Sequence, residues 1–547
     1  MTAVSNNMGN IMEHGNPTWK SVFKTFWFDV RELLACKKFS LIILLVGILT
    51  YFFFLTTVSV GVDELTSDRY LGGELLAQGR FTGQIINSIM SFDRTEVLQN
   101  LVGVVAYAAG SILMLVYLQS FLSGRRFKLH AAIMFCSIFI SYPLLVESFN
   151  YHGLPFAIGG NMILIAIILW IIRLNPKGWL PIAILLLCLS ASWHEGEIPV
   201  YLCAIFSGYL LDALSHEKRE TEEKILQNIA KYIIPLGLAL VVKTWITRII
   251  QTVVHIDAST VAGNTISWLS KSPIECIKTI LYEMKYEYFL KAFYYFPISI
   301  LLISTIIFFI FIIKYTIQKK NLRVFVLGAC VLGSLFSLTI VSGKLMPYRA
   351  SQVFSLFIAF SWCLFNSENS RIIKRRLIMT ASLLIVVNQI ISSNYWFEVD
   401  HLRAQEEGSF IQSLGYDLST INDEDKPVVF VGSYSESTAL KNRMYISSDS
   451  FWAKSINAMV GINGYKQNER YWVCIPQTIG NSAITWGIEA FAEVNTELLR
   501  LFSYYGYDIK QGTKEMYDSA KCYFESNDDG GKTKIVEFSN YIAVKIG

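Results

Sequence analysis

Charged residues are scarce in this chain of 547 residues: they make up 16% of it, whereas 53% of the residues are hydrophobic. A soluble protein carries about 25% charged residues, so the apolar surplus must be accommodated by lipid. The scarcity argues against an ordinary soluble enzyme and predicts a polytopic α-helical membrane protein. The formal net charge of +4 is too small and too dispersed to indicate nucleic-acid binding.

Several motifs are also absent. The connections between apolar stretches contain no Walker sequence and no GxGxxG after a strand, which disfavours an ATP-driven pump or a nucleotide-sugar enzyme with a cytoplasmic Rossmann domain. The nine cysteines include no CxxC pair, so a zinc site is not expected. No cofactor is predicted, and no residue pattern decides for or against a divalent metal. Cys474 and Cys522 are the pair for which a disulfide is an open possibility.

What the chain does have is about eleven apolar stretches, and crossing the bilayer takes about 17 to 25 such residues each. They are centred near Leu49, Val105, Ile138, Leu164, Leu186, Ile205, Leu238, Ile303, Leu332, Phe357 and Leu384. Every second connection is rich in Lys and Arg, for example at 125–128, 218–224 and 371–376. The positive-inside rule makes these connections cytoplasmic. It therefore predicts a cytoplasmic N-terminus and an extracytoplasmic C-terminus.

Three domains are predicted. Residues 1–38 form a cytoplasmic segment with an interfacial amphipathic helix, and 39–394 form the transmembrane body with a first outer loop at 61–95. Residues 395–547 form a small extracytoplasmic α+β domain. Apolar patterns in the outer connections predict further interfacial helices, one over 71–90 and one in SPIECIKTILYEMKYEY, where Ser272 and Glu275 form a capping box.

Within the C-terminal domain, KPVVFVGS and YWVCIPQ have strand patterns. The final stretch KCYFESNDDGGKTKIVEFSNYIAVKIG predicts a strand, a turn, a second strand and a third. Helices are expected at Ala404 to Leu414 and at Ile488 to Tyr504.

A cluster of charges follows the first apolar run, in VGVDELTSDRYLGG. Asp63, Glu64, Asp68 and Arg69 lie where the first outer loop begins. Ionisable groups at membrane level are costly and invite a functional interpretation; the alternative is a solvated loop with a local salt bridge. Further residues at outer span ends could complete an enclosed site: Glu147, His152, Trp193, His194, Glu195, Glu197, Lys344 and Arg349.

Two structural alternatives apply to these residues. His194 beside Glu195 is more often a hydrogen-bonded structural pair than a ligand or base. Lys243, in LALVVKTWITRII, is interpreted as snorkelling to the outer interface.

The combination resembles the GT-C superfamily of membrane glycosyltransferases, and more narrowly the Gtr-type O-antigen glucosyltransferases that change bacterial serotype. The resemblance is carried by Asp63-Glu64 followed by Gln78-Gly79-Arg80, and by SWHEGEIPVYL, MPYRASQVF and SNYWFEVDHLRAQEEGSFIQSL. The family pattern has two adjacent aspartates and an arginine soon after. Here the second acid is Glu64 and another acid precedes the arginine, so the base could be Asp63, Asp68 or Glu64, preferred in that order.

The resemblance implies a bacterial inner-membrane enzyme with a periplasmic active site. The implied donor is undecaprenyl-phosphate-glucose, which a donor synthase and a flippase must supply, and the implied acceptor is a sugar of the lipopolysaccharide O-antigen. Arg69, Arg80, Lys344, Arg349, His194, Glu195 and Glu147 are then candidates for binding the donor phosphate and the sugars. Alternatives are an O-antigen polymerase, a transferase for another sugar, a flippase or transporter, and a receptor-like binding protein.

Overall fold

The computed structural model describes residues 17–57, 74–90, 96–122, 126–149, 153–215, 222–255, 266–285, 287–288, 300–345, 350–367, 372–422, 424–432, 434, 437, 439–440, 443, 446–447, 471–472, 496–527 and 533–546. They divide into two compact units. Of the described residues, a helical unit contains those up to Leu55 and those from Glu74 to Asn394, and a second unit contains Thr56, Thr57 and those from Tyr395 onward. The long helix α22 (Ile372–Ile421) contributes residues to both.

Helices make up the first unit. In chain order they are α2 (Trp19–Ala35), α3 (Lys37–Thr56), α6 (Glu74–Ala77), α7 (Phe81–Met90), α8 (Glu96–Gln119), α9 (Leu129–Ile140), α10 (Leu145–Phe149), α11 (Leu154–Leu174), α12 (Trp179–Trp193), the 3-10 turn η2 (Glu195–Glu197), α13 (Ile198–Ser215), α14 (Glu222–Val254), the 3-10 turn η3 (Ser267–Leu269), α16 (Pro273–Lys285), α18 (Ile300–Lys319), α19 (Leu322–Ser334), α20 (Ser337–Ser342), α21 (Gln352–Ser367) and the first part of α22.

The helical membrane character predicted from composition is confirmed. Among the described residues, seven helical segments are long and apolar enough to cross a membrane, within α3, α8, α11, η2 with α13, α14, α18 and α22. Four shorter apolar helices, α9, α12, α19 and α21, accompany them. Each of the eleven predicted centres falls in one of these eleven segments. Eleven membrane crossings stay a prediction, because four of the helices are shorter than a span requires.

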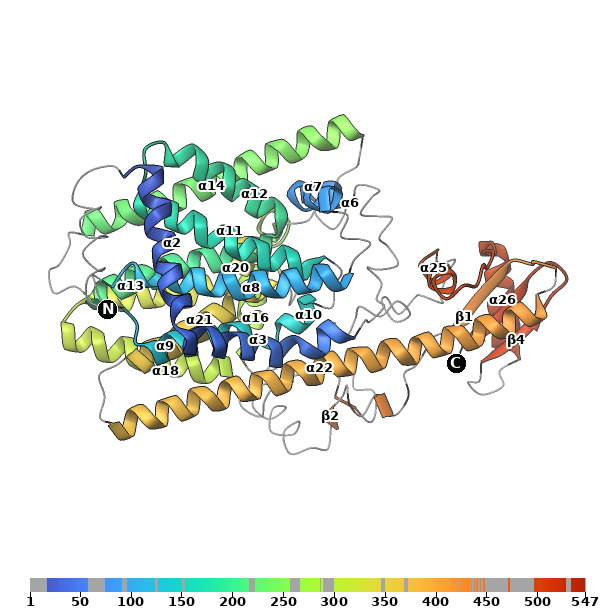
Figure 1. Cartoon of the computed structure of the whole chain (residues 1–547). Coiled ribbons are helices and arrows are strands. Elements are labelled where there is room, and N and C mark those ends of the chain that lie inside the picture. Colours follow the sequence, from blue (N-terminus) through green and yellow to red (C-terminus); the bar gives the residue numbers. More distant parts are fainter. Residues whose placement is uncertain are drawn as a thin grey trace. The chain divides into compact units, whose positions relative to one another are not determined.

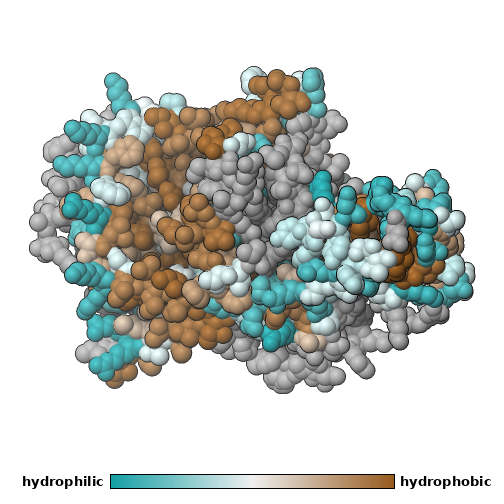
Figure 2. All heavy atoms as spheres, turned by 45° about the vertical axis from the view of Figure 1, so that its right-hand side comes forward, coloured by the Kyte–Doolittle hydropathy of each residue, from teal (hydrophilic) through white to brown (hydrophobic). Residues whose placement is uncertain are grey.

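The surface of this unit matches a lipid environment. Figure 2 shows a broad hydrophobic face with hydrophilic residues gathered along one edge. Large apolar side chains are exposed along the outer helices, for instance Leu41 and Phe52 on α3 and Trp245 on α14. Contact with lipid tails removes the penalty that water would impose on such a surface.

Helix α2 differs from the spans in direction and in composition. In Figure 1 it runs across α3, α8 and α11 rather than along them. It keeps Trp27 and Phe23 exposed, while Arg126 forms ion pairs with Asp29 and Glu32, at 3.2 and 2.6 Å. A helix with exposed aromatic residues that crosses the spans is suited to the membrane interface.

Close backbone approach between α8 and α11 fixes the centre of the unit. A Cβ added at Gly159 would lie 2.3 Å from the Gly103 carbonyl oxygen, and one at Gly103 would lie 2.4 Å from the Pro155 backbone. Small residues are what permit such approach between apolar helices, where van der Waals packing is the main attraction. The partner of α11 on its other side, α12, is close enough that a Cβ at Gly160 would lie 2.3 Å from the Trp193 ring.

The predicted capping box of α16 is confirmed. The Glu275 carboxylate accepts a hydrogen bond from the Ser272 backbone N–H at 3.2 Å, and Ser272 Oγ accepts one from the Glu275 N–H at 3.3 Å. Ile274, Ile277 and Leu281 are exposed on one face of the helix. An exposed apolar stripe of this kind is typical of a helix on a lipid surface.

The second unit contains a three-stranded sheet in the order β1-β5-β4, from β1 (Val428–Gly432), β4 (Lys534–Glu537) and β5 (Ile542–Ile546). Strand β1 pairs with β5 in parallel, and β4 pairs with β5 antiparallel. Alternate residues of β1 are buried on opposite faces. Val428 and Phe430 pack with α22 and α25 (Thr496–Tyr504), and Val429 and Val431 pack with α26 (Lys514–Ser526). A strand covered on both faces needs such a continuous apolar run.

Some of the strand and helix predictions for this unit are confirmed and others are wrong. The strand in KPVVFVGS is β1, and the last two strands are β4 and β5. KCYFES is wrong as a strand, because it is the end of α26: Thr513 caps that helix, and Tyr517, Ala520 and Phe524 are buried at helical spacing. The helix predicted from Ala404 to Leu414 is a part of α22 rather than a separate element.

Other predictions are only partly within the described residues. β3 (Tyr471–Trp472), the first two residues of YWVCIPQ, pairs antiparallel with β2 (Ile446–Ser447). The described part of the helix predicted to end at Tyr504 is α25. The Asp-Gly-Gly turn and Cys474 lie outside the described residues, and Cys522 has a free thiol.

Candidate functional site

Three of the segments that carry the family resemblance lie in the helical unit, and the contacts described below link them directly or through α7, α12 and α14. They are Gln78-Gly79-Arg80, between α6 and α7; His194 to Glu197, between α12 and α13; and Ala350, just before α21. Each of these segments connects or precedes helices and therefore lies at helix ends. The name "connection cluster" is used below for these three segments and the side chains that contact them.

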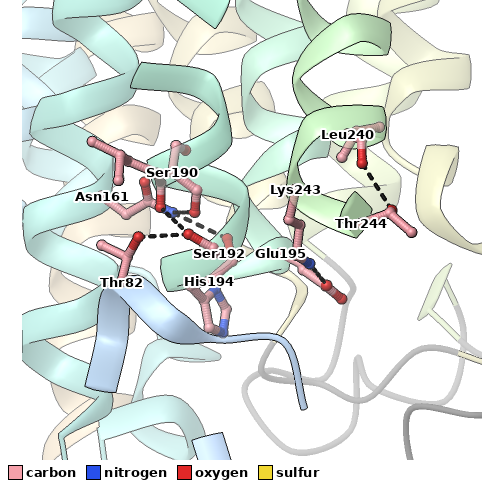
Figure 3. A network of polar contacts seen from close by, with 10 residues as sticks. Thr82, Asn161, Ser190, Ser192, His194, Glu195, Leu240, Lys243 and Thr244 are labelled. Carbon is pink, nitrogen blue, oxygen red and sulfur yellow. Dashed lines mark hydrogen bonds and ion pairs between the residues drawn. The ribbon is translucent and has the colours of Figure 1, made fainter. Parts of the chain in front are cut away.

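The first segment is a sharp break between two short helices. Gly79 has φ +74°, a left-handed conformation that glycine adopts without strain. Beyond the break, Thr82 Oγ1 lies 2.5 Å from Ser192 Oγ, so that the start of α7 is hydrogen-bonded to the end of α12 (Figure 3). The single helix predicted over 71–90 is therefore wrong, since the chain turns at Gly79 and packs α7 against α12.

Asn161 holds the second segment in place from within α11. Its Nδ2 donates to the Ser190 carbonyl oxygen at 3.2 Å and to the His194 carbonyl oxygen at 3.0 Å. The side chain of Asn161 is fully buried. It joins the last turn of α12 to α11 at the residue where η2 is about to begin (Figure 3).

The turn η2 also contacts the third segment. Gly196 is enclosed by its neighbours: a Cβ at this position would lie 2.6 Å from His194 Cε1 and 3.0 Å from Ala350 Cα. A larger residue here would displace either the histidine ring or the backbone before α21. The glycine thus allows the segment preceding α21 to lie directly against η2.

His194 and Glu195 have different surroundings, although they are adjacent. His194 is buried at 3% exposure, whereas the Glu195 carboxylate forms an ion pair with Lys243 of α14. Figure 3 shows the two side chains pointing away from each other. The structure gives Lys243 a partner: its ammonium group is held by Glu195 and its side chain is 11% exposed, while snorkelling to the outer interface stays a prediction.

Glu197, two residues further on, is fully buried. Neither of its carboxylate oxygens has a hydrogen-bond partner among the residues that the structure describes. Buried polar groups are nearly always hydrogen-bonded, and exceptions often mark functional positions. Glu197, already named from the sequence among the residues of an outer site, is therefore a candidate for contact with a ligand.

The predicted site residues fall into three groups. Arg80, His194 and Glu195 belong to the connection cluster. Lys344 follows Gly343, where an added Cβ would lie 2.9 Å from Cys276 Sγ of α16 and 3.3 Å from Trp268 Cδ1 of η3, so the backbone before Lys344 lies next to those two elements. Outside the described residues lie Asp63, Glu64, Asp68, Arg69, His152 and Arg349, and of Glu147 only the backbone, in α10, is described.

Sequence reasoning did not single out Asn161, Thr82 or Ser192. A signal for Asn161 was present: it is a lone amide in the apolar run LPFAIGGNMILIAIILW, and polar residues within spans tend to face the protein interior. Thr82 and Ser192 gave no comparable signal, because hydroxyl side chains are common in apolar helices.

A metal site receives no support from clustering. The described part of the chain contains no group of three or more His, Cys, Asp or Glu side chains arranged to hold a metal ion. The acids of the first outer loop lie outside that part.

Comparison with known families gives one match, to a family described as glucosyl transferase GtrII, over residues 52–366. This is more than half of the chain and includes the whole connection cluster. The chain belongs to the GtrII glucosyl transferase family. No curated protein and no solved structure matches it. Membership identifies the chain as a glycosyltransferase, and the matched range begins in α3 and ends in α21.

Proposed function

We propose that this GtrII family member transfers glucose from undecaprenyl-phosphate-glucose to a sugar of the lipopolysaccharide O-antigen, on the periplasmic side of the bacterial inner membrane. The observation that carries the proposal is the connection cluster. Cationic, acidic and hydrogen-bonding side chains gather at the ends of apolar helices, where the headgroup of a lipid-linked substrate resides.

The reaction needs a base and a cation on opposite sides of the sugar. In the proposed step Asp63 accepts the proton of the acceptor hydroxyl, whose oxygen forms a bond to the anomeric carbon. The bond between that carbon and the phosphate oxygen breaks, and its electron pair leaves with undecaprenyl phosphate. A single displacement inverts the anomeric centre.

The leaving phosphate requires positive charge. A guanidinium can hold a phosphate through two parallel hydrogen bonds, and Arg69, Arg80, Lys344 and Arg349 are the proposed sources. His194, Glu195 and Glu147 are proposed to bind the sugars. No step of this scheme requires a metal ion.

Family membership favours transfer over transport. A flippase or transporter of this size would be expected to show internal repeats about a midplane site, and the sequence has none. The identity of the transferred sugar rests on the family description, and the polyprenyl donor rests on topology, because nucleotide sugars are cytoplasmic.

The test is glucosylation of O-antigen by Asp63→Asn, compared with Asp68→Asn and Glu64→Gln, measured by mass spectrometry of purified lipopolysaccharide. We expect Asp63→Asn to abolish the added hexose while the protein is still inserted in the membrane at the wild-type level. The other two variants are expected to keep measurable transfer. Normal transfer by Asp63→Asn would remove this residue as the base, and normal transfer by all three would refute a base in the first outer loop.

Topology has its own test. Alkaline phosphatase fused after Gly547 should be active, since that enzyme matures only outside the cytoplasm. An inactive fusion would place the C-terminus inside and would contradict a periplasmic site.

A further inference from the structure

One face of α14 is polar and is directed at the connection cluster. Lys243, Thr247 and Gln251 recur every four residues and therefore share a face. A Cβ at Gly79 would lie 3.1 Å from Thr247, and Gln251 Nε2 donates to the Ala77 carbonyl oxygen at 3.0 Å. Thr247 and Gln251 therefore contact the break between α6 and α7. Lys243 places its ammonium group beside η2.

The opposite edge of the same helix segment is apolar and exposed. Val241, Trp245 and Ile249 are 63%, 71% and 54% exposed, and they also recur every four residues. In a membrane these side chains contact lipid tails. Around Lys243, α14 therefore combines a surface for hydrocarbon with an enclosed positive charge, which are the two features needed to hold a lipid that has an anionic headgroup.

The ion pair between Lys243 and Glu195 is unequal. The Lys243 side chain is 11% exposed and that of Glu195 is 45% exposed. The ion pairs of Arg403 differ in that both partners are buried: the Arg403 side chain is 1% exposed, and those of Asp400 and Glu407 are 2% and 5% exposed. The half-exposed Glu195 carboxylate can move into water and be solvated there. The enclosed Lys243 ammonium group would then need a new anionic partner, because an unpaired buried charge is costly.

We propose that Lys243 binds the phosphate of the lipid-linked sugar donor, and that the Glu195 carboxylate occupies its ammonium group until the phosphate displaces it. This inference rests on the proposed function, because it takes a polyprenyl phosphate as the ligand. It changes the role of Glu195, which becomes the anion that the substrate replaces. The proposal also accounts for the glutamate at the first position of η2.

The experiment measures binding of undecaprenyl phosphate to the full-length protein in nanodiscs of phosphatidylglycerol and phosphatidylethanolamine. Lys243→Met keeps the length of the side chain and removes its charge. Loss of one charge-assisted hydrogen bond corresponds to a Kd about 10- to 100-fold higher. Lys243→Arg should retain most of the affinity. Lys231→Met, on the same helix but at an exposed lysine that bonds Asn228, is the matched control and should bind as the wild type does.

Two further variants separate a ligand from a structural pair. Glu195→Gln removes the competing anion and should bind undecaprenyl phosphate as tightly as the wild type or more tightly. The charge reversal Lys243→Glu with Glu195→Lys restores an ion pair, so a purely structural role predicts restored folding and binding. Our proposal predicts that the reversed protein folds, as judged by size-exclusion chromatography, and still binds at least tenfold more weakly.

The outcomes are distinct. Wild-type affinity in Lys243→Met, or full recovery of binding in the charge-reversed protein, would overturn the inference and leave the proposed function intact. Absence of binding by the wild type itself would overturn the polyprenyl donor, and the inference with it. The loss of affinity caused by Lys243→Met is also measured in nanodiscs without phosphatidylglycerol. If the loss is the same as with phosphatidylglycerol, the effect belongs to the donor phosphate. If the loss disappears, Lys243 interacts with ordinary anionic headgroups and the proposal is refuted.

Discussion

The most direct consequence of the connection cluster concerns Asn161, which we expect to position η2 without touching substrate. Replacing it by Leu keeps the volume similar and removes two hydrogen bonds, to the carbonyl oxygens of Ser190 and His194. The Ser190 carbonyl oxygen still accepts from the His194 N–H at 3.1 Å, so the α12 terminus keeps one of its bonds. The perturbation therefore loosens the link between α11 and the start of η2, and leaves the helix itself formed.

The size of the effect follows from the two bonds. Side-chain hydrogen bonds within membranes contribute about 0.6 to 1.7 kcal/mol each, so that Asn161→Leu should cost about 1–3 kcal/mol. If that energy holds η2 in its active position, transfer should fall by about 5- to 140-fold, since about 1.4 kcal/mol corresponds to a factor of ten. The substitution is expected to shift Glu195, the first residue of η2, from its position.

The assay pairs two measurements: the rate of glucose transfer in membrane vesicles and the thermal midpoint of the purified protein in detergent. Asn388→Leu is the matched control, because Asn388 lies in the apolar part of α22 and its side chain, unlike the Asn161 Nδ2 group, forms no hydrogen bond within the described part of the chain. The control should be neutral or slightly stabilising. Equal effects of the two substitutions, or unchanged transfer and midpoint in Asn161→Leu, would refute the positioning role.

Two further predictions concern charges away from the connection cluster. Arg403→Met should destabilise the C-terminal part by about 3–5 kcal/mol, because it leaves Asp400 and Glu407 buried without a cation; faster proteolysis of the full-length protein measures this, and Arg443→Met, at an exposed pair, should cost about 0–1 kcal/mol. Burial raises the pKa of Asp29 to about 6, against the opposing effect of a nearby arginine. The folded state therefore binds the Asp29 proton more tightly than the unfolded state does. The free energy of unfolding should fall as pH rises from about 4 to 6. Asp29→Asn should flatten that part of a thermal-midpoint profile, and an unchanged slope would contradict the assignment.

The elements that could be predicted from sequence are those with a strong local signal. Eleven apolar stretches gave eleven helical segments because lipid exposure forces long apolar runs, and the capping box at Ser272 gave the start of α16 because two reciprocal hydrogen bonds define it. Strand β1 followed from an apolar run that is buried on both faces. In each case the residues that determine the element are neighbours in the sequence.

The features that sequence reasoning missed or predicted wrongly depend on contacts between distant residues. KCYFES has a strand-like composition, yet it ends a helix whose buried stripe reaches back to Tyr517. Lys243 resembles any lysine near the end of a span, and only the fold brings Glu195 to it, from 48 positions away. Asn161 likewise acts on carbonyl oxygens that α12 supplies. Tertiary partners of this kind leave no pattern in the local sequence.

The division of labour within the connection cluster explains why these residues differ in character. Groups that hold the backbone are neutral: the Asn161 amide and the hydroxyls of Thr82 and Ser192 bond to carbonyls or to each other. The acids of η2 differ from these groups: Glu197 has no hydrogen-bond partner among the described residues, and Glu195 is paired with a lysine from another helix. Neutral amide and hydroxyl bonds keep their strength when a charged substrate enters or leaves, whereas an ion pair at the same position would compete with it. A framework of neutral hydrogen bonds that carries two acids is therefore suited to the proposed binding of a phosphate-linked sugar and release of the lipid phosphate.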